Sequence, residues 1–475
     1  MRRAGVYTRR TSIVVAVAAI AGVGLRLSRS DAAGSSAPRL TYYLDPAGSD
    51  DADGLSPGTA WRTLDRVRDV VLAPGHSVLL RGGARFTGML QLDHTDAGSA
   101  AKPVTIGSFG VGKAIIATEA TSAVYIHNTA GVEIRDLEVI GDSAAYTGSG
   151  GIVCYNDLSD GRVLDHIVIA GVEASGFKNG IEVGAANTGF RDVTISDSLA
   201  HDNMEAGVAV YGPSLQPSAP RYAHANVTVS SVQAYRNAGD AKNTERNTGN
   251  GIVLGSVSTG LIEQSAAYEN GWLCAAPQGP AGIWTYDSTA VVIEHNVAHD
   301  NYTGGDADGD GFDLDQNTSD CVLQNNVAYN NDGAGLMLYA ETAGTYNRNN
   351  IIRNNVSTGS PRNAVWYGGI TVAGNVTGAD ISGNSVTVSG AGSGPGPGPS
   401  SGPGPGPGPS TGPGPGPGSG PGPVQSPVVR LAGTLQGVVL SNNRLTSDGA
   451  GPIVATQDGA NASAVLKSGN QLSGP

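Results

Sequence analysis

The chain has 475 residues, of which 71 are glycine, and aromatic residues make up only 5%. This composition fits many tight turns around thin aliphatic interiors, and it does not require several domains. The formal charge of −13 disfavours nucleic acid and other polyanions as partners.

Residues 1–32 are predicted to be a signal peptide that directs the chain out of the cell. The sequence around Arg9 and Arg10 resembles a twin-arginine signal. The segment begins with basic residues at 2–10. An apolar run at 13–25 follows, too short to span a membrane, and a small-residue cleavage site stands at 30–32. The mature protein is therefore expected to be secreted, without a membrane span. It is also expected to be a monomer. Arg26 and Arg29 after the apolar run leave retention at the cell surface as an alternative.

Residues 42–72 predict a strand, a Gly/Asp-rich turn and a short helix that starts after Thr59, a good N-cap. Apolar residues then recur at helical spacing, at Trp61, Leu64, Val67, Val71 and Leu72. Such a helix would cap a solenoid, whose first coil otherwise exposes strand edges and core. Residues 74–83 are expected to begin the first full coil.

One short phrase recurs eight times between Gly151 and Gly369, with start-to-start spacings of 24 to 44 residues. Each copy is a glycine, an aliphatic residue or Phe, any residue, and usually another aliphatic residue. Repeats of this length are typical of solenoids, propellers or arrays. No helical period separates the copies, so each one predicts a coil of a parallel β-helix. The copies start at Gly151, Gly180, Gly207, Gly251, Gly282, Gly311, Gly335 and Gly369.

A second periodicity predicts an inward ladder of asparagines at a tight turn. Its members are Asn296, Asn326, Asn355, Asn384, Asn443 and Asn470. The one long step, of 59 residues, contains residues 392–423, which are only Gly, Pro, Ser and Thr. Without these 32 residues the step is one ordinary coil of 27. Residues 392–423 are therefore expected to be a disordered loop inserted in a late coil of a single domain spanning residues 40–475.

Residues 42–64, with the letters TAWRTL at 59–64, resemble the start of secreted right-handed parallel β-helix proteins of the pectate-lyase-like superfamily. The resemblance covers roughly residues 40–390. It implies an all-β, right-handed parallel β-helix with a short N-terminal capping helix, in a carbohydrate-active protein. Its motifs specify fold better than function.

Alternate residues of each repeated phrase are expected to face away from the core, and therefore solvent. The third positions read Val153, Glu182, Ala209, Val253, Trp284, Asp313, Met337 and Thr371. The fifth positions read Tyr155, Gly184, Tyr211, Gly255, Tyr286, Asp315, Tyr339 and Ala373. Aromatic planes in a shallow groove suit the C–H face of a sugar. A polysaccharide-binding groove is predicted at Trp284, Tyr286, Tyr339, Tyr211 and Tyr155, with Glu182 at its border; alternatively, the rings only cover sheet surface.

Carboxylates concentrate in residues 306–315, where Asp306, Asp308, Asp310, Asp313 and Asp315 stand. Asp332 precedes the next strand at the equivalent place. So much like charge requires a protonated carboxyl or a bound cation. Asp313, Asp315, Asp332 and Asp310 are therefore predicted to be catalytic, with Asp313 and either Asp332 or Asp315 at the wider spacing of inverting glycosidases.

Asp306, Asp308 and Asp310 also begin like a calcium loop, but Asn317 stands where an EF-hand has its Glu. A looser Ca²⁺ site and a solvated acidic turn remain alternatives. Asp310-Gly311-Phe312 resembles strand starts of family-nine pectate lyases, which place a catalytic lysine one coil later. Here that position is Met337, and no lysine lies between Lys242 and Lys467. A lyase base would have to be Lys242, Arg246, Arg348 or Arg353.

Three functions follow from these residues. The preferred prediction is a secreted, polysaccharide-active glycoside hydrolase that acts through paired Asp carboxylates and needs no cofactor. The first alternative is a calcium-dependent, pectate-type lyase in the same groove. The second is a non-catalytic glycan-binding or cell-surface protein whose aspartates hold Ca²⁺.

Overall fold

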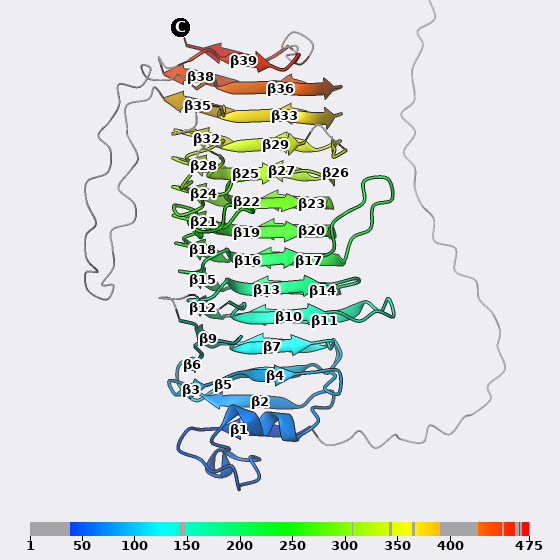
Figure 1. Ribbon diagram of the computed structural model, residues 1–475, viewed down its shortest axis with the longest axis vertical. Coiled ribbons are helices and arrows are strands. Elements are labelled where there is room, and N and C mark those ends of the chain that lie inside the picture. Colours follow the sequence, from blue (N-terminus) through cyan, green and yellow to red (C-terminus); the bar gives the residue numbers. More distant parts are fainter. Residues whose placement is uncertain are drawn as a thin grey trace, which may run out of the picture. The chain divides into compact units, whose positions relative to one another are not determined.

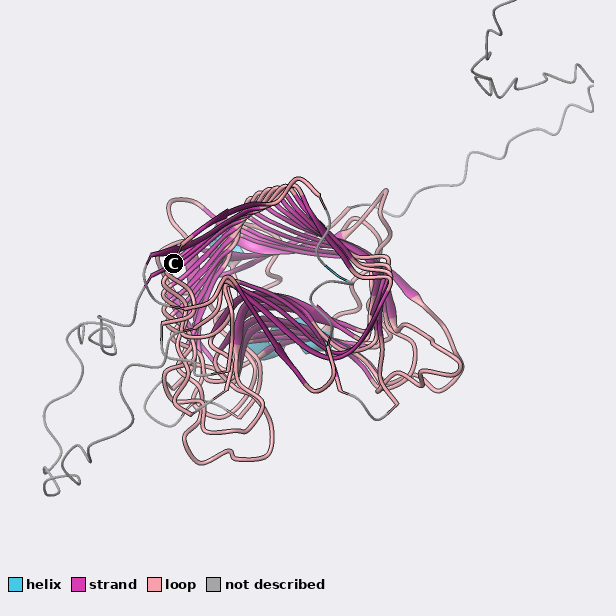
Figure 2. Ribbon diagram, turned by 90° about the horizontal axis from the view of Figure 1, so that it is seen from above, coloured by secondary structure: helices cyan, strands magenta, loops and turns pink. Residues whose placement is uncertain are grey.

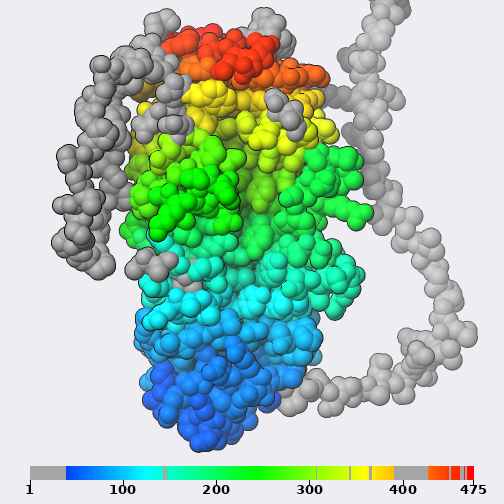
Figure 3. All heavy atoms as spheres, in the orientation of Figure 1, coloured from blue at the N-terminus to red at the C-terminus, as the bar shows by residue number. Residues whose placement is uncertain are grey.

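The computed structural model describes residues 39–142, 146, 148–305, 307–341, 344–362, 366–389, 426–448, 451–460, 465 and 468–474. They belong to one compact unit that starts at Arg39. The predicted signal peptide, residues 1–32, and the Gly-Pro tract, residues 392–423, lie outside the described residues. Parallel strands, stacked coil upon coil, form this unit (Figure 1), and Figure 3 shows the coils as bands of colour in sequence order.

Each coil adds strands to three series, which Figure 2 shows in projection along the stack. We name each series after one member. The β25 series contains β4 (Leu90–Leu92), β7 (Val124–His127), β10 (Ile152–Asn156), β13 (Asn179–Ala185), β16 (Ala206–Tyr211), β19 (Asn250–Gly255), β22 (Ala281–Tyr286), β25 (Asp310–Leu314), β29 (Leu336–Ala340), β33 (Ile370–Thr377), β36 (Val429–Gln436) and β39 (Val454–Gln457).

The β20 series contains β1 (Thr41–Leu44), β2 (Ser77–Arg81), β5 (Val104–Phe109), β8 (Val132–Arg135), β11 (Leu164–Ala170), β14 (Phe190–Ser196), β17 (His224–Ser230), β20 (Val257–Glu263), β23 (Thr289–Glu294), β26 (Thr318–Ser319), β27 (Val322–Gln324), β30 (Asn347–Arg348), β31 (Ile351–Arg353), β34 (Asp380–Ser382) and β37 (Val439–Ser441). The β24 series contains β3 (Arg85–Thr87), β6 (Ala114–Ala117), β9 (Leu137–Ile140), β12 (Glu173–Ser175), β15 (Leu199–His201), β18 (Gln233–Tyr235), β21 (Ala266–Tyr268), β24 (Val297–His299), β28 (Val327–Tyr329), β32 (Val356–Thr358), β35 (Ser385–Ser389), β38 (Arg444–Asp448) and β40 (Gln471–Ser473).

The core lies between the three series and runs the length of the stack. Inward residues of neighbouring coils stand in register, as do Ile283, Phe312 and Leu336, and all three are fully buried. This alternation follows from the two-residue period of a strand, which sends the residue after each repeated glycine inward. Each coil thereby fixes the position of its outward residues along the same strand.

The N-terminal segment contains two 3₁₀ helices, η1 (Pro57–Thr59) and η2 (Leu64–Asp69). Leu64 and Val67 of η2 are buried and join the core together with Trp61. Val71, expected on the same face, is 63% exposed. That expectation is wrong because η2 ends before it, so the helical spacing no longer applies.

One column of asparagines and one column of aromatic rings connect successive coils. Each ladder asparagine donates its side-chain N–H to the side-chain oxygen of the next, from Asn296 to Asn470, which confirms the predicted ladder. The Asn384 side chain donates a hydrogen bond directly to that of Asn443. The coil before residues 390–425 and the coil after them are therefore neighbours in the stack. A stacked column, with ring centroids 4.5 to 5.0 Å apart, is formed by His201, Tyr235, Tyr268, His299 and Tyr329.

Candidate functional site

One column of outward residues crosses the whole β25 series. Backbone register places the predicted third positions side by side, and the column extends beyond them at both ends. Its members in order are Gln91, Tyr125, Val153, Glu182, Ala209, Val253, Trp284, Asp313, Met337, Thr371, Arg430 and Ala455. The repeated phrase therefore predicted which side chains are neighbours on this face.

The expectation that the third positions face solvent is wrong. From Val153 to Thr371 none of these residues is more than 8% exposed. They point away from the main core but are covered by neighbouring side chains and loops. Trp284 packs in one small apolar cluster with Val253 and Tyr286, and Met337 packs in another with Tyr367. Asp313 lies between these clusters, since its strand neighbours are Trp284 and Met337.

The predicted aromatic residues lie along this face, and the four tyrosines Tyr155, Tyr211, Tyr286 and Tyr339 are half-buried. A side chain added at Gly255 would meet the ring of Tyr286, and one added at Gly184 would meet the ring of Tyr211. These glycines therefore allow each ring to lie down against the preceding coil.

A cavity of about 390 Å³, which we call the central cavity, opens between Trp284 and Tyr339. Four aspartates line it: Asp308, Asp310, Asp313 and Asp315. Further cavities adjoin it along the stack and share lining residues with their neighbours. We name them the Arg246 cavity, which shares Trp284 and Asp315 with the central cavity, the Asp458 cavity, which shares Tyr339 and Trp366 with it, and the Tyr125 cavity, which shares Lys178 and Tyr211 with the Arg246 cavity. We call this row of neighbouring cavities along the β25 series the groove.

The four aspartates differ in their hydrogen bonds. Asp308 accepts from the Tyr367 hydroxyl and, at 2.8 Å, from the backbone N–H of Gly279. Asp310 accepts from the backbone N–H of Ala334. Asp315 accepts from the backbone N–H of the next residue at 2.6 Å.

Asp313 is different, because its Oδ1 is buried and has no hydrogen-bond partner among the described residues. The indole N–H of Trp284, its strand neighbour on the same cavity wall, also lacks a partner there. A buried donor and a buried acid that each lack a hydrogen-bond partner are unfavourable. A ligand with both an acceptor and a donor would satisfy the pair.

The four carboxyls also differ in how far their pKa values are raised. Burial raises the pKa of all four, and the neighbouring carboxylates raise the pKa of Asp310, Asp313 and Asp315 further. The pKa values of Asp310 and Asp313 lie well above the ordinary value, whereas that of Asp315 is about 7. The Tyr367 and Gly279 hydrogen bonds oppose the rise in the pKa of Asp308. Asp308 is thus best equipped to carry charge, and Asp313 to stay protonated.

Asp332 does not join this group. Its side chain is buried outside the residues that line the central cavity. It accepts a hydrogen bond from the backbone of Thr303 at 3.2 Å and faces Arg362 Nη2 at 3.3 Å. Asp332 thus lies outside the lining of the cavity that holds Asp313, and it faces an arginine that the repeat pattern does not reveal.

Several cavity residues were missed from the sequence. Trp366 and Tyr367 come from the segment before β33, and Gln278 comes from the segment before β22. They lie outside the repeated phrases, in loops whose path the coil period does not determine. The aromatic pair Trp366-Tyr367, in a chain poor in aromatics, was the one available signal.

Of the three predicted metal ligands, Asp306 lies outside the described residues. Asp308 and Asp310 line the central cavity and bond protein groups. In the described part of the chain, no group of three or more His, Cys, Asp or Glu side chains is arranged to hold a metal ion.

Basic groups are scarce around the central cavity. Among its described lining residues there is no lysine, arginine or histidine. Of the four bases considered for a lyase, only Arg246 lines the groove, in the Arg246 cavity. It pairs with Glu205, which also faces Lys178 at 3.5 Å. Lys242, Arg348 and Arg353 are exposed and line none of these cavities.

Comparisons with known proteins agree with this architecture. The family model described as "Right handed beta helix region" matches residues 225–393. The chain is thus a right-handed parallel β-helix, as its resemblance to the pectate-lyase-like superfamily implied. Lacto-N-biosidase from Bifidobacterium longum subsp. longum is 24% identical over 420 residues, covering 67% of this chain but only 26% of that relative. The chain therefore spans about a quarter of that curated protein's length.

Solved structures show the same fold. The GH136 lacto-N-biosidase from Eubacterium ramulus aligns with a TM-score of 0.57 at 16% identity, over 91% of this chain and 68% of that one. The A-module of the mannuronan C-5 epimerase AlgE4 from Azotobacter vinelandii aligns with a TM-score of 0.52 at 17% identity, over 91% and 96% of the two chains. Among the described residues, no helix is long and apolar enough to cross a membrane.

Proposed function

We propose that the protein is a glycoside hydrolase that cleaves an uncharged glycan in the central cavity. The observation that carries the proposal is that four neighbouring carboxyls line one cavity and differ in their hydrogen-bond partners. Glycoside hydrolysis requires one carboxylic acid that gives a proton to the leaving oxygen and one carboxylate that acts as base or nucleophile. Environments that separate the pKa values of nearby carboxyls are how proteins assign these two roles.

Asp315 is the proposed general acid. Its pKa of about 7 keeps much of it protonated near neutral pH, and it is half-buried at the junction of the central and Arg246 cavities. A general acid works best when its pKa lies near the working pH. Asp308 is the proposed carboxylate, because Tyr367 and Gly279 donate hydrogen bonds that stabilise its charge.

Asp313 and Trp284 are proposed to bind the sugar rather than to exchange protons with it. A sugar hydroxyl or acetamido group carries both a donor and an acceptor and would satisfy their unpaired atoms. Asp310 lines the same cavity, and burial raises its pKa well above the ordinary value. The carboxylates favour an uncharged glycan over a uronate, since the groove's cations, Arg246 and Lys178, both face Glu205.

The relatives support this proposal. Lacto-N-biosidase is a glycoside hydrolase, and this chain shares 24% identity with a quarter of one such protein. Calcium-dependent elimination is less well supported, because it needs a base at the cleavage site and the described lining of the central cavity has no basic side chain.

The test is a panel of neutral and uronate-containing glycans, digested with and without a calcium chelator. Production of new reducing ends and the absorbance of unsaturated uronates are recorded together. Hydrolysis predicts reducing ends from a neutral glycan, insensitive to chelator and without the unsaturated product. Unsaturated product that disappears with chelator would instead establish a lyase.

A further inference from the structure

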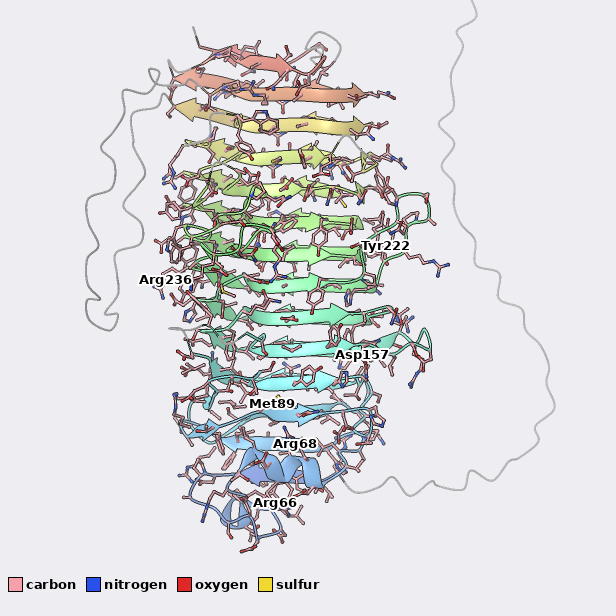
Figure 4. The ribbon with its side chains drawn as sticks, in the orientation of Figure 1. Arg66, Arg68, Met89, Asp157, Tyr222 and Arg236 are labelled. Carbon is pink, nitrogen blue, oxygen red and sulfur yellow. The ribbon has the colours of Figure 1, made fainter. Side chains whose placement is uncertain are left out.

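The Tyr125 cavity lies several coils away from the proposed catalytic carboxyls. The Tyr125 cavity, about 450 Å³ in volume, is lined by groove residues of β4, β7, β10 and β13, including Gln91, Tyr125, Tyr155 and Glu182. Figure 4 labels Met89, which lines this cavity beside β4, near the N-terminal end of the stack. The proposed cleavage chemistry uses none of these residues.

The position of this cavity follows from the register. Glu182 and Asp313 occupy the same outward column, four strands apart. Strands of neighbouring coils are about 4.8 Å apart, which separates the two residues by roughly 19 Å. Tyr125 lies two strands further from Asp313 than Glu182 does, so roughly 29 Å from it. A ligand that reaches from Asp315 into this cavity must be several sugars long.

The cavity wall has the chemistry of a sugar site. Tyr125 and Tyr155 are half-buried, and the ring of His127 stacks on both, with centroids 5.3 and 6.5 Å away. Glu182 is held in place by the Tyr211 hydroxyl at 2.6 Å and the Asn179 side-chain amide at 2.9 Å. Fixed aromatic planes beside an oriented carboxylate suit a sugar, which offers C–H faces and hydroxyl donors.

We propose that the Tyr125 cavity is a remote glycan subsite that makes cleavage depend on chain length. The inference rests on the proposed function, because the bound glycan is the one that reaches the central cavity. Lys178 and Tyr211 line both the Tyr125 and the Arg246 cavities, so the two cavities are neighbours on the same face. The enzyme therefore binds long neutral glycans more tightly than short ones and cleaves them at a distance from the bound end.

Binding tests the subsite separately from catalysis. The full chain carrying Asp315→Asn is applied to an array of neutral oligosaccharides, from disaccharides to octasaccharides, built on glucose, galactose, mannose, xylose and N-acetylhexosamine. Affinity for at least one series is expected to rise with length, and adding Tyr155→Ala is expected to lower affinity for its longest member about tenfold. The control change is Tyr329→Ala, at the end of the aromatic column in the β24 series, and it should leave the length dependence intact.

Kinetics then tests the link to cleavage in the otherwise native enzyme. Tyr155→Ala is expected to reduce kcat/KM at least about tenfold more on the longest substrate than on the shortest, through KM. Equal losses at all lengths, affinity independent of length, or no binding on the array would overturn the remote subsite. Hydrolysis by the native chain with any of these results would leave the proposed function standing, so the two failures are distinguishable.

Discussion

Asp308 and Tyr367 are joined by two hydrogen bonds, although 59 residues separate them in the sequence. The Asp308 backbone N–H donates to the Tyr367 oxygen at 2.8 Å, and the Tyr367 hydroxyl donates to the Asp308 carboxylate. The loop before β33 thereby fixes both the backbone and the side chain of an aspartate that precedes β25. Burial of the ring, followed by the charge of Asp308, raises the pKa of Tyr367, so its proton stays in place as a donor.

Replacing this hydroxyl should weaken the proposed carboxylate without removing it. Tyr367→Phe keeps the ring in its apolar cluster with Met337 but removes the donor to Asp308. A hydrogen bond to a charged group contributes about 1.5 kcal/mol, so kcat should fall about tenfold. The acidic limb of the pH–rate profile should also move to higher pH, because the pKa of Asp308 rises. Tyr329→Phe, outside the groove, is the control; an unmoved acidic limb would contradict the role of Asp308.

The role of Asp315 as general acid predicts a basic limb in the pH–rate profile. Asp315 must be protonated to act, and its pKa is about 7, so kcat/KM should fall as pH rises above about 7. Burial is the largest cause of the raised pKa, and the Glu341 carboxylate adds to it. Glu341→Gln should therefore shift the basic limb to lower pH, whereas Glu263→Gln in β20 should not. A limb that stays in place would exclude Asp315 as the titrating acid.

The buried carboxyls should also lower stability at neutral pH. A carboxyl whose pKa is raised on folding is protonated in the folded state at pH values where the unfolded chain has released the proton. Its contribution to the free energy of unfolding is complete below the unfolded pKa, near 3.9, and is lost as pH rises through the folded value. For Asp315 this window runs from about 4 to about 7.

Asp313→Asn tests this effect, because it removes an acid whose pKa is well above the ordinary value. The variant should be at least about 1 kcal/mol more stable than the native chain at pH 8, with a smaller gain at pH 4. Thermal unfolding at the two pH values measures both, with the exposed Asp320→Asn of the same coil as control. A variant that is less stable at both values would contradict the account of Asp313.

Arg362 should act in stability rather than in chemistry. It faces Asp300 at 3.2 Å and Asp332 at 3.3 Å, and the side chains of Arg362 and Asp332 are only 13% and 3% exposed. Arg362→Met leaves Asp332 buried without its cation, at a cost of about 3 kcal/mol in the free energy of unfolding. Adding Asp332→Asn should recover much of that loss, as denaturant titration would measure. Arg353→Met, on an exposed arginine, should change little.

The sequence was sufficient to predict the positions of residues that the coil period determines. The repeated phrase placed Trp284, Asp313 and Met337 side by side, because a parallel β-helix puts equivalent residues of successive coils in register. The cluster of Asp308, Asp310, Asp313 and Asp315 was also predictable, since these residues are neighbours in the chain.

Contacts made by loops could not be predicted in this way. Asp332 was placed beside Asp313 by its position before a strand, but the side chain turns to Arg362 instead. The cover over the third positions was equally hidden: Tyr367 packs on Met337 from a segment without repeat. Periodicity fixes the strands, whereas the loops that close the cavity are fixed by individual contacts.

The central claim is that hydrolysis depends on Asp308 and Asp315, and one comparison of variants tests it most directly. Asp308→Asn, Asp315→Asn and the control Asp320→Asn are assayed as folded full chains on the best neutral glycan from the panel, with reducing ends as the readout. The first two should lose at least about a thousandfold in kcat while Asp320→Asn keeps native turnover. Native turnover in either Asp308→Asn or Asp315→Asn would contradict the claim.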